Sequence, residues 1–331
     1  MTRFNRVRIP LRSAARHLAF GLAWCLACCA SHAQEWLPTK TIRIVVPIVG
    51  STNDVIARLV APELQKALGQ TVVVENKGGA GGTIGAMDVV KAAPDGHTLL
   101  VGFNGPIAVN VTLMPKLPYD PQKDLAPITL AVTAPQYLAV HPSLPVRNVA
   151  ELVALAKTRR LAYASISPGS ASHLTFEMLK TASGMDIVHV PYKGSGLAVT
   201  DLIGGQVDAG FFVPGNIQQF AKDGRARLIA SSGDKRMAAT PNLPTLVEQG
   251  YPGLVALTWI GFLAPGSTPK NIIERYNKEL VRILTSAELK PKLEALEVDV
   301  VAGSPKAFAD LIASEIPRWG KVVRDTGAKA E

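Results

Sequence analysis

The sequence predicts an α/β fold built from two mainly parallel sheets, and three observations support this prediction. Short apolar runs rich in β-branched residues alternate with segments whose apolar residues recur at helical spacing. Gly, Pro and Asp clusters separate these runs. After a last strand over 258–264 the chain turns wholly helical, and such helices need a sheet to cover. This alternation favours helices on both faces of each sheet and right-handed crossovers.

The first series of elements has a βαβαβ pattern. Its helix over 54–68 places Ile56, Val60 and Leu64 on one face, and Pro62 inside it removes one backbone donor and predicts a bend. The expected elements are a strand over 42–47, a helix over 54–68, a strand over 72–75, a helix near 84–93 and a strand over 98–102.

A second series follows the Pro-rich stretch 106–127. Asn148 and Glu151 have the spacing of a capping box, and Thr268-Pro269 and Ser304-Pro305 predict the starts of two late helices. The expected strands are 137–140, 161–165, 187–190, 209–213, 227–231 and 258–264, and the expected helices are 148–157, 173–182, 197–204 and 217–223.

The late helices predict how the chain divides into domains. They return most simply to the first sheet, so domain 1 would comprise 34–134 plus 255–331, with domain 2 inserted over 135–254. Two connections would then cross a hinge between the domains. Because α/β sheets bind ligands at the carboxyl ends of their strands, two facing sheets predict a cleft.

Residues 1–33 have the pattern of an export signal. Five arginines precede an apolar run over 18–30, which ends in Ser31-His32-Ala33. We therefore expect a periplasmic protein whose mature chain begins at about Gln34. The alternatives are an N-terminal membrane anchor and lipid attachment at Cys28. Cleavage would remove all three cysteines, so no disulfide is expected.

Composition limits the function classes. Without the five signal arginines, 30 basic and 26 acidic residues leave a net charge of +4. This small positive charge suits an anionic small ligand or ordinary solubility. The chain lacks the stripe of basic residues that is typical of nucleic-acid-binding proteins, so we expect no nucleic-acid partner. The histidines after residue 33 lack the spacing of a transition-metal site, and the glycine cluster 78–85 fits no nucleotide motif. We expect no metal and no cofactor.

Three loops lead from predicted strands into helices and could bind an anion. Residues 49–54 and 165–173 each combine glycine with hydroxyl side chains, and the free N–H groups of the following helix would point at a ligand. The third loop contains Asn104. Each has a purely structural alternative: Thr52 or Asn53 capping its own helix, His173 bonding its own loop, and Asn104 in a plain turn.

At these residues the chain resembles the Bug-type receptors, the extracytoplasmic solute-binding proteins of tripartite tricarboxylate transporters. The motifs that carry the resemblance are IRIVVP, VVVENKGGAGGTIGA, AAPDGHTLLVG, LPYDPQKDLAPI, the SHL at 172–174, HVPYKGSG, LIGGQVDAGF and LTWIGFLAP, in order along the chain. The resemblance implies a type II periplasmic-binding-protein fold, a monomer whose two domains close on a small organic carboxylate, and the membrane subunits of such a transporter as partners.

The resemblance also implies which residues contact the ligand. On one side these are Ile48, Gly50, Ser51, Thr52, Asn53 and Asp54; on the other Ser167, Gly169, Ser170, Ser172 and His173; at the edge Asn104 and Gly105. Two departures fall in these loops. The first loop is one residue shorter than the family pattern, with Ile48 for an aromatic residue and a single glycine, and Ser167-Pro168 replaces the common Gly-Asn.

The sequence therefore predicts a solute-binding protein that has no catalytic residues. Two alternatives stay open. A hydroxyl-rich second loop would also suit an exported hydrolytic enzyme that uses Ser170 or Ser172, and a receptor of this kind could serve a membrane signalling protein as a sensing subunit.

Overall fold

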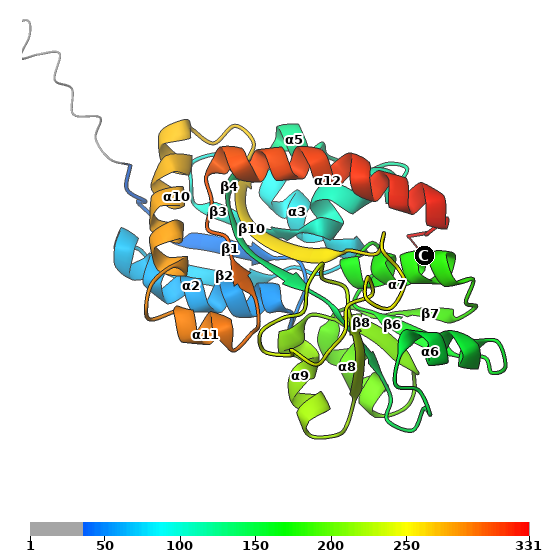
Figure 1. Ribbon diagram of the computed structural model, residues 1–331. Coiled ribbons are helices and arrows are strands. Elements are labelled where there is room, and N and C mark those ends of the chain that lie inside the picture. The colour runs from blue at the N-terminus through cyan, green and yellow to red at the C-terminus, as the bar shows by residue number, and fades with distance from the viewer. Residues whose placement is uncertain (1–35, 331) are drawn as a thin grey trace, which may run out of the picture. The chain divides into compact units, whose positions relative to one another are not determined.

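Two mixed sheets organise residues 36–330, the part of the chain that the computed structural model describes (Figure 1). Residues 1–35 lie outside the described residues, and so do the predicted signal peptide and Cys28. The first sheet has the strand order β11-β4-β10-β3-β1-β2 and the second β7-β6-β8-β5-β9. The strands are β1 Ile42–Val46, β2 Val72–Asn76, β3 Thr98–Phe103, β4 Leu125–Pro135, β5 Tyr137–Val140, β6 Ala162–Ser165, β7 Val188–Pro191, β8 Ala209–Phe212, β9 Arg227–Ser231, β10 Leu257–Pro265 and β11 Asp299–Val300.

Helices cover both faces of each sheet. In the first sheet α3, η2 and α12 contribute to one core, and α2 packs against α10. In the second, α6 and α7 pack on one face and α8 and α9 on the other. The helices are α2 Thr52–Leu68, η1 Ala80–Gly82, α3 Thr83–Val90, η2 Gly105–Val109, α4 Asn110–Leu113, α5 Pro121–Asp124, α6 Val149–Ala156, α7 Ala171–Ser183, α8 Ser195–Ile203, α9 Pro214–Lys222, α10 Lys270–Leu284, α11 Lys290–Glu294 and α12 Pro305–Thr326.

The predicted strands and helices are confirmed, and the structure adds the short helices η1, η2, α4 and α5, which were not predicted. Further differences concern two strands, the sheet type and one helix cap. Two strands were not predicted: β4, which begins at the end of the Pro-rich stretch, and β11, which has only two residues. The sheets are mixed, because β10 runs antiparallel to β3 and β4, and β5 antiparallel to β8 and β9. The helix α10 is capped at Pro269 and not at Thr268. In contrast, Asn148 and Ser304 cap their helices as expected.

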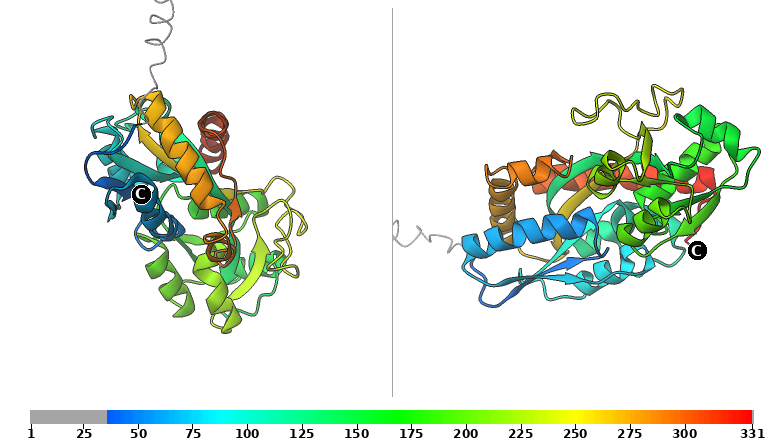
Figure 2. Two further views of the ribbon diagram at one scale, coloured as in Figure 1. Left: turned by 90° about the vertical axis from the view of Figure 1, so that its left-hand side faces the viewer. Right: turned by 90° about the horizontal axis from the view of Figure 1, so that it is seen from below.

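The strands β4 and β10 connect the two sheets. β4 is followed after Gln136 by β5 of the second sheet, and the chain returns through residues 232–256, a long connection outside the sheets (Figure 2). β10 then enters the first sheet between β3 and β4. The antiparallel orientation of β10 follows from this return, since the chain re-enters the first sheet from the end at which β4 left it.

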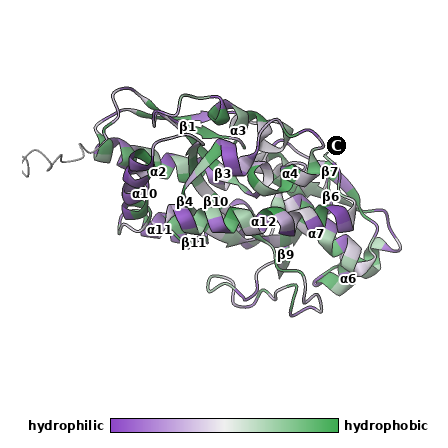
Figure 3. Cartoon of the chain, turned by 90° about the horizontal axis from the view of Figure 1, so that it is seen from above, coloured by the Kyte–Doolittle hydropathy of each residue, from purple (hydrophilic) through white to green (hydrophobic). Residues whose placement is uncertain are grey.

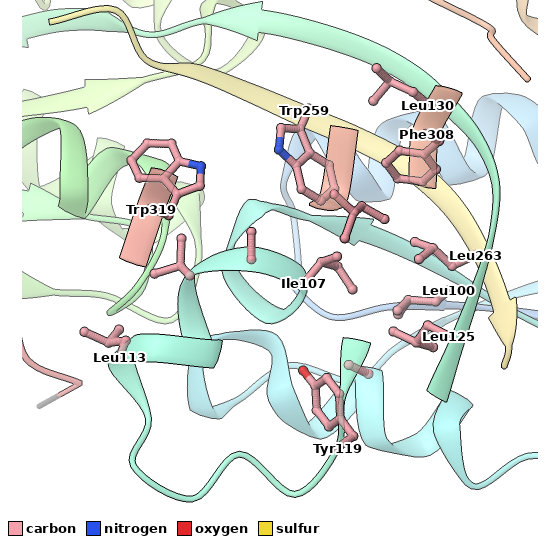
Figure 4. Packing of buried hydrophobic residues seen from close by; sticks show 14 of the residues in the cluster. Leu100, Ile107, Leu113, Tyr119, Leu125, Leu130, Trp259, Leu263, Phe308 and Trp319 are labelled. Atoms are coloured by element: carbon pink, nitrogen blue, oxygen red, sulfur yellow. The ribbon is translucent and has the colours of Figure 1, made fainter. Parts of the chain in front are cut away.

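The core of the first sheet lies beneath α12. Phe308 and Trp319 of this helix are fully buried, and Trp259 of β10 packs edge-on against Phe308 (Figure 4). On the outside, α10 is mainly hydrophilic (Figure 3), while its Tyr276 and Leu280 face inward.

A buried carboxylate ties this core together. Glu315 Oε2 accepts hydrogen bonds from Trp259 Nε1 at 2.9 Å and Trp319 Nε1 at 2.6 Å, and from Asn104 Nδ2 at 3.3 Å. Arg318 also donates to Glu315, from the solvent side. One side chain thus joins a helix, a crossing strand and the chain segment after β3.

We expect Glu315→Ala to destabilise the protein by about 3–5 kcal/mol, because it leaves two buried indole N–H groups, those of Trp259 and Trp319, without their acceptor. Chemical denaturation measures this change. Glu294→Ala is the matched control, since Glu294 is exposed and pairs only loosely with Lys290. A loss below 1 kcal/mol would mean that the carboxylate is not needed for this packing.

Candidate functional site

A small pocket lies where the loops after β1 and β6 approach each other. Both loops lead directly into helices, α2 and α7, so two helix N-termini face the same space. We call this the polar pocket. Its lining residues are Ile48, Ser51, Thr52, Asn53, Phe103, Gln136, Ile166, Ser170, Ala171, Ser172, Phe211, Phe212, Val213, Asn216 and Thr258. None of them is charged, and the cavity volume of about 20 Å³ holds roughly one water-sized group.

The first loop presents donors that the protein itself does not use. Gly50 turns the chain with a positive φ of 62°. Ser51 occupies the N-cap position of α2, but its Oγ caps no helix N–H and instead donates to Ile48 O at 2.9 Å. The first intrahelical bonds start at Asp54 N, so the N–H groups of Thr52 and Asn53 precede them. Helix α2 therefore directs positive dipole charge at the pocket.

In the second loop, the hydroxyl groups of Ser170 and Ser172 donate their hydrogen bonds within the loop itself. Ser170 Oγ donates to Ser167 O at 2.6 Å and accepts from His173 N. The proton of Ser172 then points to Ser170 Oγ, 2.8 Å away, while Ser172 Oγ accepts from Ile166 N. What this loop offers a ligand is the N-terminus of α7.

Three buried polar atoms around the polar pocket have no partner in the described structure. They are Thr52 Oγ1, Asn53 Nδ2 and Gln136 Oε1, in side chains that are 4%, 5% and 2% exposed. Gln136 Nε2 donates to Thr258 Oγ1 at 2.8 Å. Because an unpaired buried polar atom costs about 1–3 kcal/mol, their convergence indicates a place for a polar ligand group.

The loops of the two sheets are in direct contact beside the pocket. Ser195 Oγ of α8 donates to Gly50 O at 2.9 Å. Gly194 has a φ of 133°, and a Cβ there would lie 2.8 Å from Val49 O. A Cβ at Gly81 would lie 2.9 Å from Pro168 O. At Gly194 and Gly81, the absence of a side chain lets the loops of the two sheets approach each other closely.

The structure brings six of the predicted site residues into the polar pocket and places the others nearby or elsewhere. Those in its lining are Ile48, Ser51, Thr52, Asn53, Ser170 and Ser172. The carbonyl oxygen of Gly50 accepts the hydrogen bond from Ser195 that joins the first loop to α8. Ser167 lines a neighbouring cavity. Gly169 packs against Asn110, and Asp54 bonds to Arg58 and Asn76.

Asn104, Gly105 and His173 lie outside the pocket lining, in structural positions. Asn104 is fully buried, with its Oδ1 accepting from Trp259 N and its Nδ2 donating to Glu315. Gly105 packs against Phe103. His173 Nδ1 accepts from Gly169 N, and its ring stacks on His189 at 4.1 Å.

Sequence reasoning missed the part of the pocket that comes from the crossing strands. Gln136 and Thr258 belong to these passages, and Asn216 to α9. Gln136 carried a usable signal, because a polar side chain between two apolar strands, β4 and β5, requires a partner or a ligand.

One serine–histidine pair bears on the hydrolase alternative. Ser165 Oγ and His189 Nε2 are 2.7 Å apart, but Ser165 is fully buried and is not part of the pocket lining. Burial lowers the pKa of His189 to about 4. The pair is therefore poorly placed to attack a ligand in the polar pocket.

The described residues also bear on metal binding and on membrane insertion. Over 36–330, no group of three or more His, Cys, Asp or Glu residues is arranged to hold a metal ion. No helix in the same range has the length and apolar character needed to cross a membrane.

Comparison with known proteins gives consistent matches. The sequence model of the tripartite tricarboxylate transporter family receptor matches residues 56–328. The chain is 38% identical to protein BugT of Bordetella pertussis, over 90% of this chain and 92% of BugT.

Solved structures agree with this. The R. palustris protein Rpa4515 with adipate is 34% identical, covers 88% of this chain and 99% of its own, and superposes with a TM-score of 0.85. MatC from Rhodopseudomonas palustris with bound malate is also 34% identical, covers 87% of this chain and 100% of its own, and gives 0.81. The fold is thus the periplasmic-binding-protein fold that the sequence predicted.

The stacked histidines predict a pH dependence of stability. Burial lowers the pKa of His173 to about 3 and that of His189 to about 4, against a model-peptide value near 6.5. Below pH 6.5 the unfolded chain binds protons that the folded chain does not, so stability falls as the pH drops towards 4. The slope is up to about 1.4 kcal/mol per pH unit for each histidine.

Denaturation between pH 7.5 and 4.5 measures this slope. We expect His173→Gln to flatten it, while His141→Gln, a change at a histidine outside the stack, leaves it unchanged. An equal slope in both variants would attribute the pH dependence to other groups.

Proposed function

The chain belongs to the tripartite tricarboxylate transporter receptor family, and we propose from this premise that it is a periplasmic receptor. It binds a small organic carboxylate in the polar pocket, catalyses no reaction, and delivers the ligand to the membrane subunits of a tripartite tricarboxylate-type transporter. The related structures with adipate and malate support a carboxylate as the ligand.

The observation that carries the proposal is the convergence of unpaired donors at two helix N-termini. A carboxylate accepts hydrogen bonds only, and Thr52 Oγ1 and Asn53 Nδ2 can donate to it. Gln136 becomes a third donor when its amide turns over, because Thr258 Oγ1 then donates to its oxygen. Hydrogen bonds to a charged group contribute about 1.5–3 kcal/mol each.

Binding is coupled to closure in this proposal. The two sheets with their helices are domains, comprising 34–134 plus 255–331 and 135–254, and they rotate about the passages at Gln136 and before Leu257. Because the ligand contacts loops of both domains, it favours the closed state. The contact between Ser195 and Gly50 supports this, since it joins the domains at the pocket.

The hydroxyl groups support a receptor over a hydrolase. The protons of Ser170 and Ser172 bond within their loop, and neither Oγ lies beside a base. The nearest histidine in sequence, His173, uses its Nδ1 for Gly169 N.

We expect a carboxylate, but not its uncharged amide, to raise the melting temperature of the protein. A ligand at 100 times its Kd adds about 2.7 kcal/mol of stability. Thr52→Val should remove at least nine-tenths of the affinity without destabilising the free protein, since Thr52 Oγ1 has no protein partner. Thr285→Val, at the end of α10, is the control. Equal shifts with acids and amides would contradict carboxylate recognition.

Closure predicts a second effect, at Gly194. We expect Gly194→Ala to weaken ligand binding at least tenfold, because its Cβ would meet Val49 O and the left-handed φ disfavours alanine. Small-angle scattering with and without ligand checks whether the variant stays open. Gly196→Ala, where a Cβ meets nothing within 4 Å, is the matched control. Normal ligand-induced compaction in Gly194→Ala would argue against this contact as part of closure.

A further inference from the structure

A second cavity adjoins the polar pocket at the same cleft. It has a volume of about 540 Å³ and lies between the first loop, the glycine cluster before α3 and the loops of the second sheet. We call it the apolar chamber. Its lining residues are Pro47, Ile48, Val49, Gly78, Gly79, Ala80, Gly81, Ile84, Met114, Ile166, Ser167, Pro168, Tyr192, Lys193 and Ala330. Ile48 and Ile166 line both cavities and so form the partition between them.

The chamber offers a ligand mainly apolar surface. Val49 and Ile84 present large apolar side chains at its wall and are 52% and 53% exposed. Covering them removes apolar area from water and is favourable. Tyr192 already donates its hydroxyl to Asp201 at 2.6 Å, so it adds little polarity.

Few groups in the chamber could hold a second carboxylate. Among the described residues that line it, the one cation is Lys193, which is exposed to solvent. The remaining unpaired side-chain donor in this lining is Ser167 Oγ, which is buried. A carboxylate inside the chamber would lose water and find only one buried side-chain donor there, which is unfavourable.

The two cavities differ in size, and this difference indicates which part of a ligand each can hold. The polar pocket has a cavity volume of only about 20 Å³, so it can admit the polar end of a ligand but not the ligand body. The space next to it is large enough for a body of ring size, once Ile48 or Ile166 changes rotamer.

We propose that the ligand is a monocarboxylate with a branched or aromatic apolar body. Its carboxylate lies among Thr52, Asn53 and Gln136, and its body fills the apolar chamber against Ile48, Val49 and Ile84. This inference rests on the proposed function and adds the chemical class of the ligand.

Calorimetric titration of the purified protein tests the inference with a matched series of acids. The probes are acetate, isovalerate and phenylacetate as monocarboxylates, and succinate, malate and adipate as dicarboxylates. We expect phenylacetate or isovalerate to bind at least tenfold more tightly than acetate and than every dicarboxylate. Tighter binding of a dicarboxylate would overturn the inference.

One exposed isoleucine, Ile84, and one exposed leucine, Leu197, provide a matched pair of variants. Ile84→Asn should weaken phenylacetate binding three- to tenfold and leave acetate unchanged, because only the larger body reaches it. Leu197→Asn, at a similarly exposed residue of α8 outside both linings, should change neither. Equal losses in both variants, or none in Ile84→Asn, would overturn the placement of the body.

The same titrations separate this inference from the proposed function. Dicarboxylate binding that disappears in Thr52→Val would overturn the monocarboxylate class and leave the carboxylate receptor standing. Binding of no acid in the series, or acid binding that Thr52→Val leaves intact, would overturn both. A preference for adipate that Lys193→Gln removes would show that Lys193 holds a second carboxylate, against the inference.

Discussion

The chain passes between its two sheets twice, and the hydrogen bonds that join these passages fix where the pocket lies. Gln136 N donates to Ser232 Oγ at 2.9 Å, Ser232 N donates to Gln136 O at 2.8 Å, and Ser232 Oγ donates to Ala256 O at 2.5 Å. Gln136 then reaches Thr258 of β10 with its side chain. The residue that ties the crossings together is thus also a wall of the polar pocket.

This coincidence of connection and pocket has a mechanical consequence. In the closure that we propose, rotation about the passages would move the loops after β1 and β6 relative to each other, while Gln136, in the first passage, would stay close to the axis. A ligand that bonds to Gln136 and to both helix N-termini can therefore make all of its hydrogen bonds only when the loops have come together. The Glu315 network stiffens the first sheet just behind this point, because it holds β10 and α12 together through Trp259 and Trp319.

The polar and apolar halves of the cleft arise from different constraints. The polar half follows from helix starts, where unpaired N–H groups and small polar side chains are the rule. The apolar half depends on Ile48 and on the glycine cluster before α3, which brings the backbone close to the loops of the second sheet. At Gly81 the distance from a Cβ to Pro168 O would be only 2.9 Å, so shape and not charge defines this side.

The sequence by itself determined the elements and much of the first loop. Periodicity located the strands and helices, because each depends on local patterns of burial and capping; Asn148 and Ser304 cap as expected. It also pointed to Thr52 and Asn53, since a glycine-and-hydroxyl turn before a helix is a local signal. The long strand β4 was not predicted, because it begins inside a proline-rich stretch and is buried along most of its length, so it shows no clear alternation.

Only the tertiary structure decided which polar side chains remain unpaired. Asn104 and Asn53 look alike in sequence, yet Asn104 bonds to Trp259 and Glu315, residues more than 150 positions away, whereas Asn53 Nδ2 meets no acceptor. The position of Gln136 in the pocket likewise depends on a long-range contact, the pairing of β4 with β10, which brings Gln136 next to Thr258. Whether a buried polar group is satisfied depends on partners brought together by folding, and no local pattern encodes them.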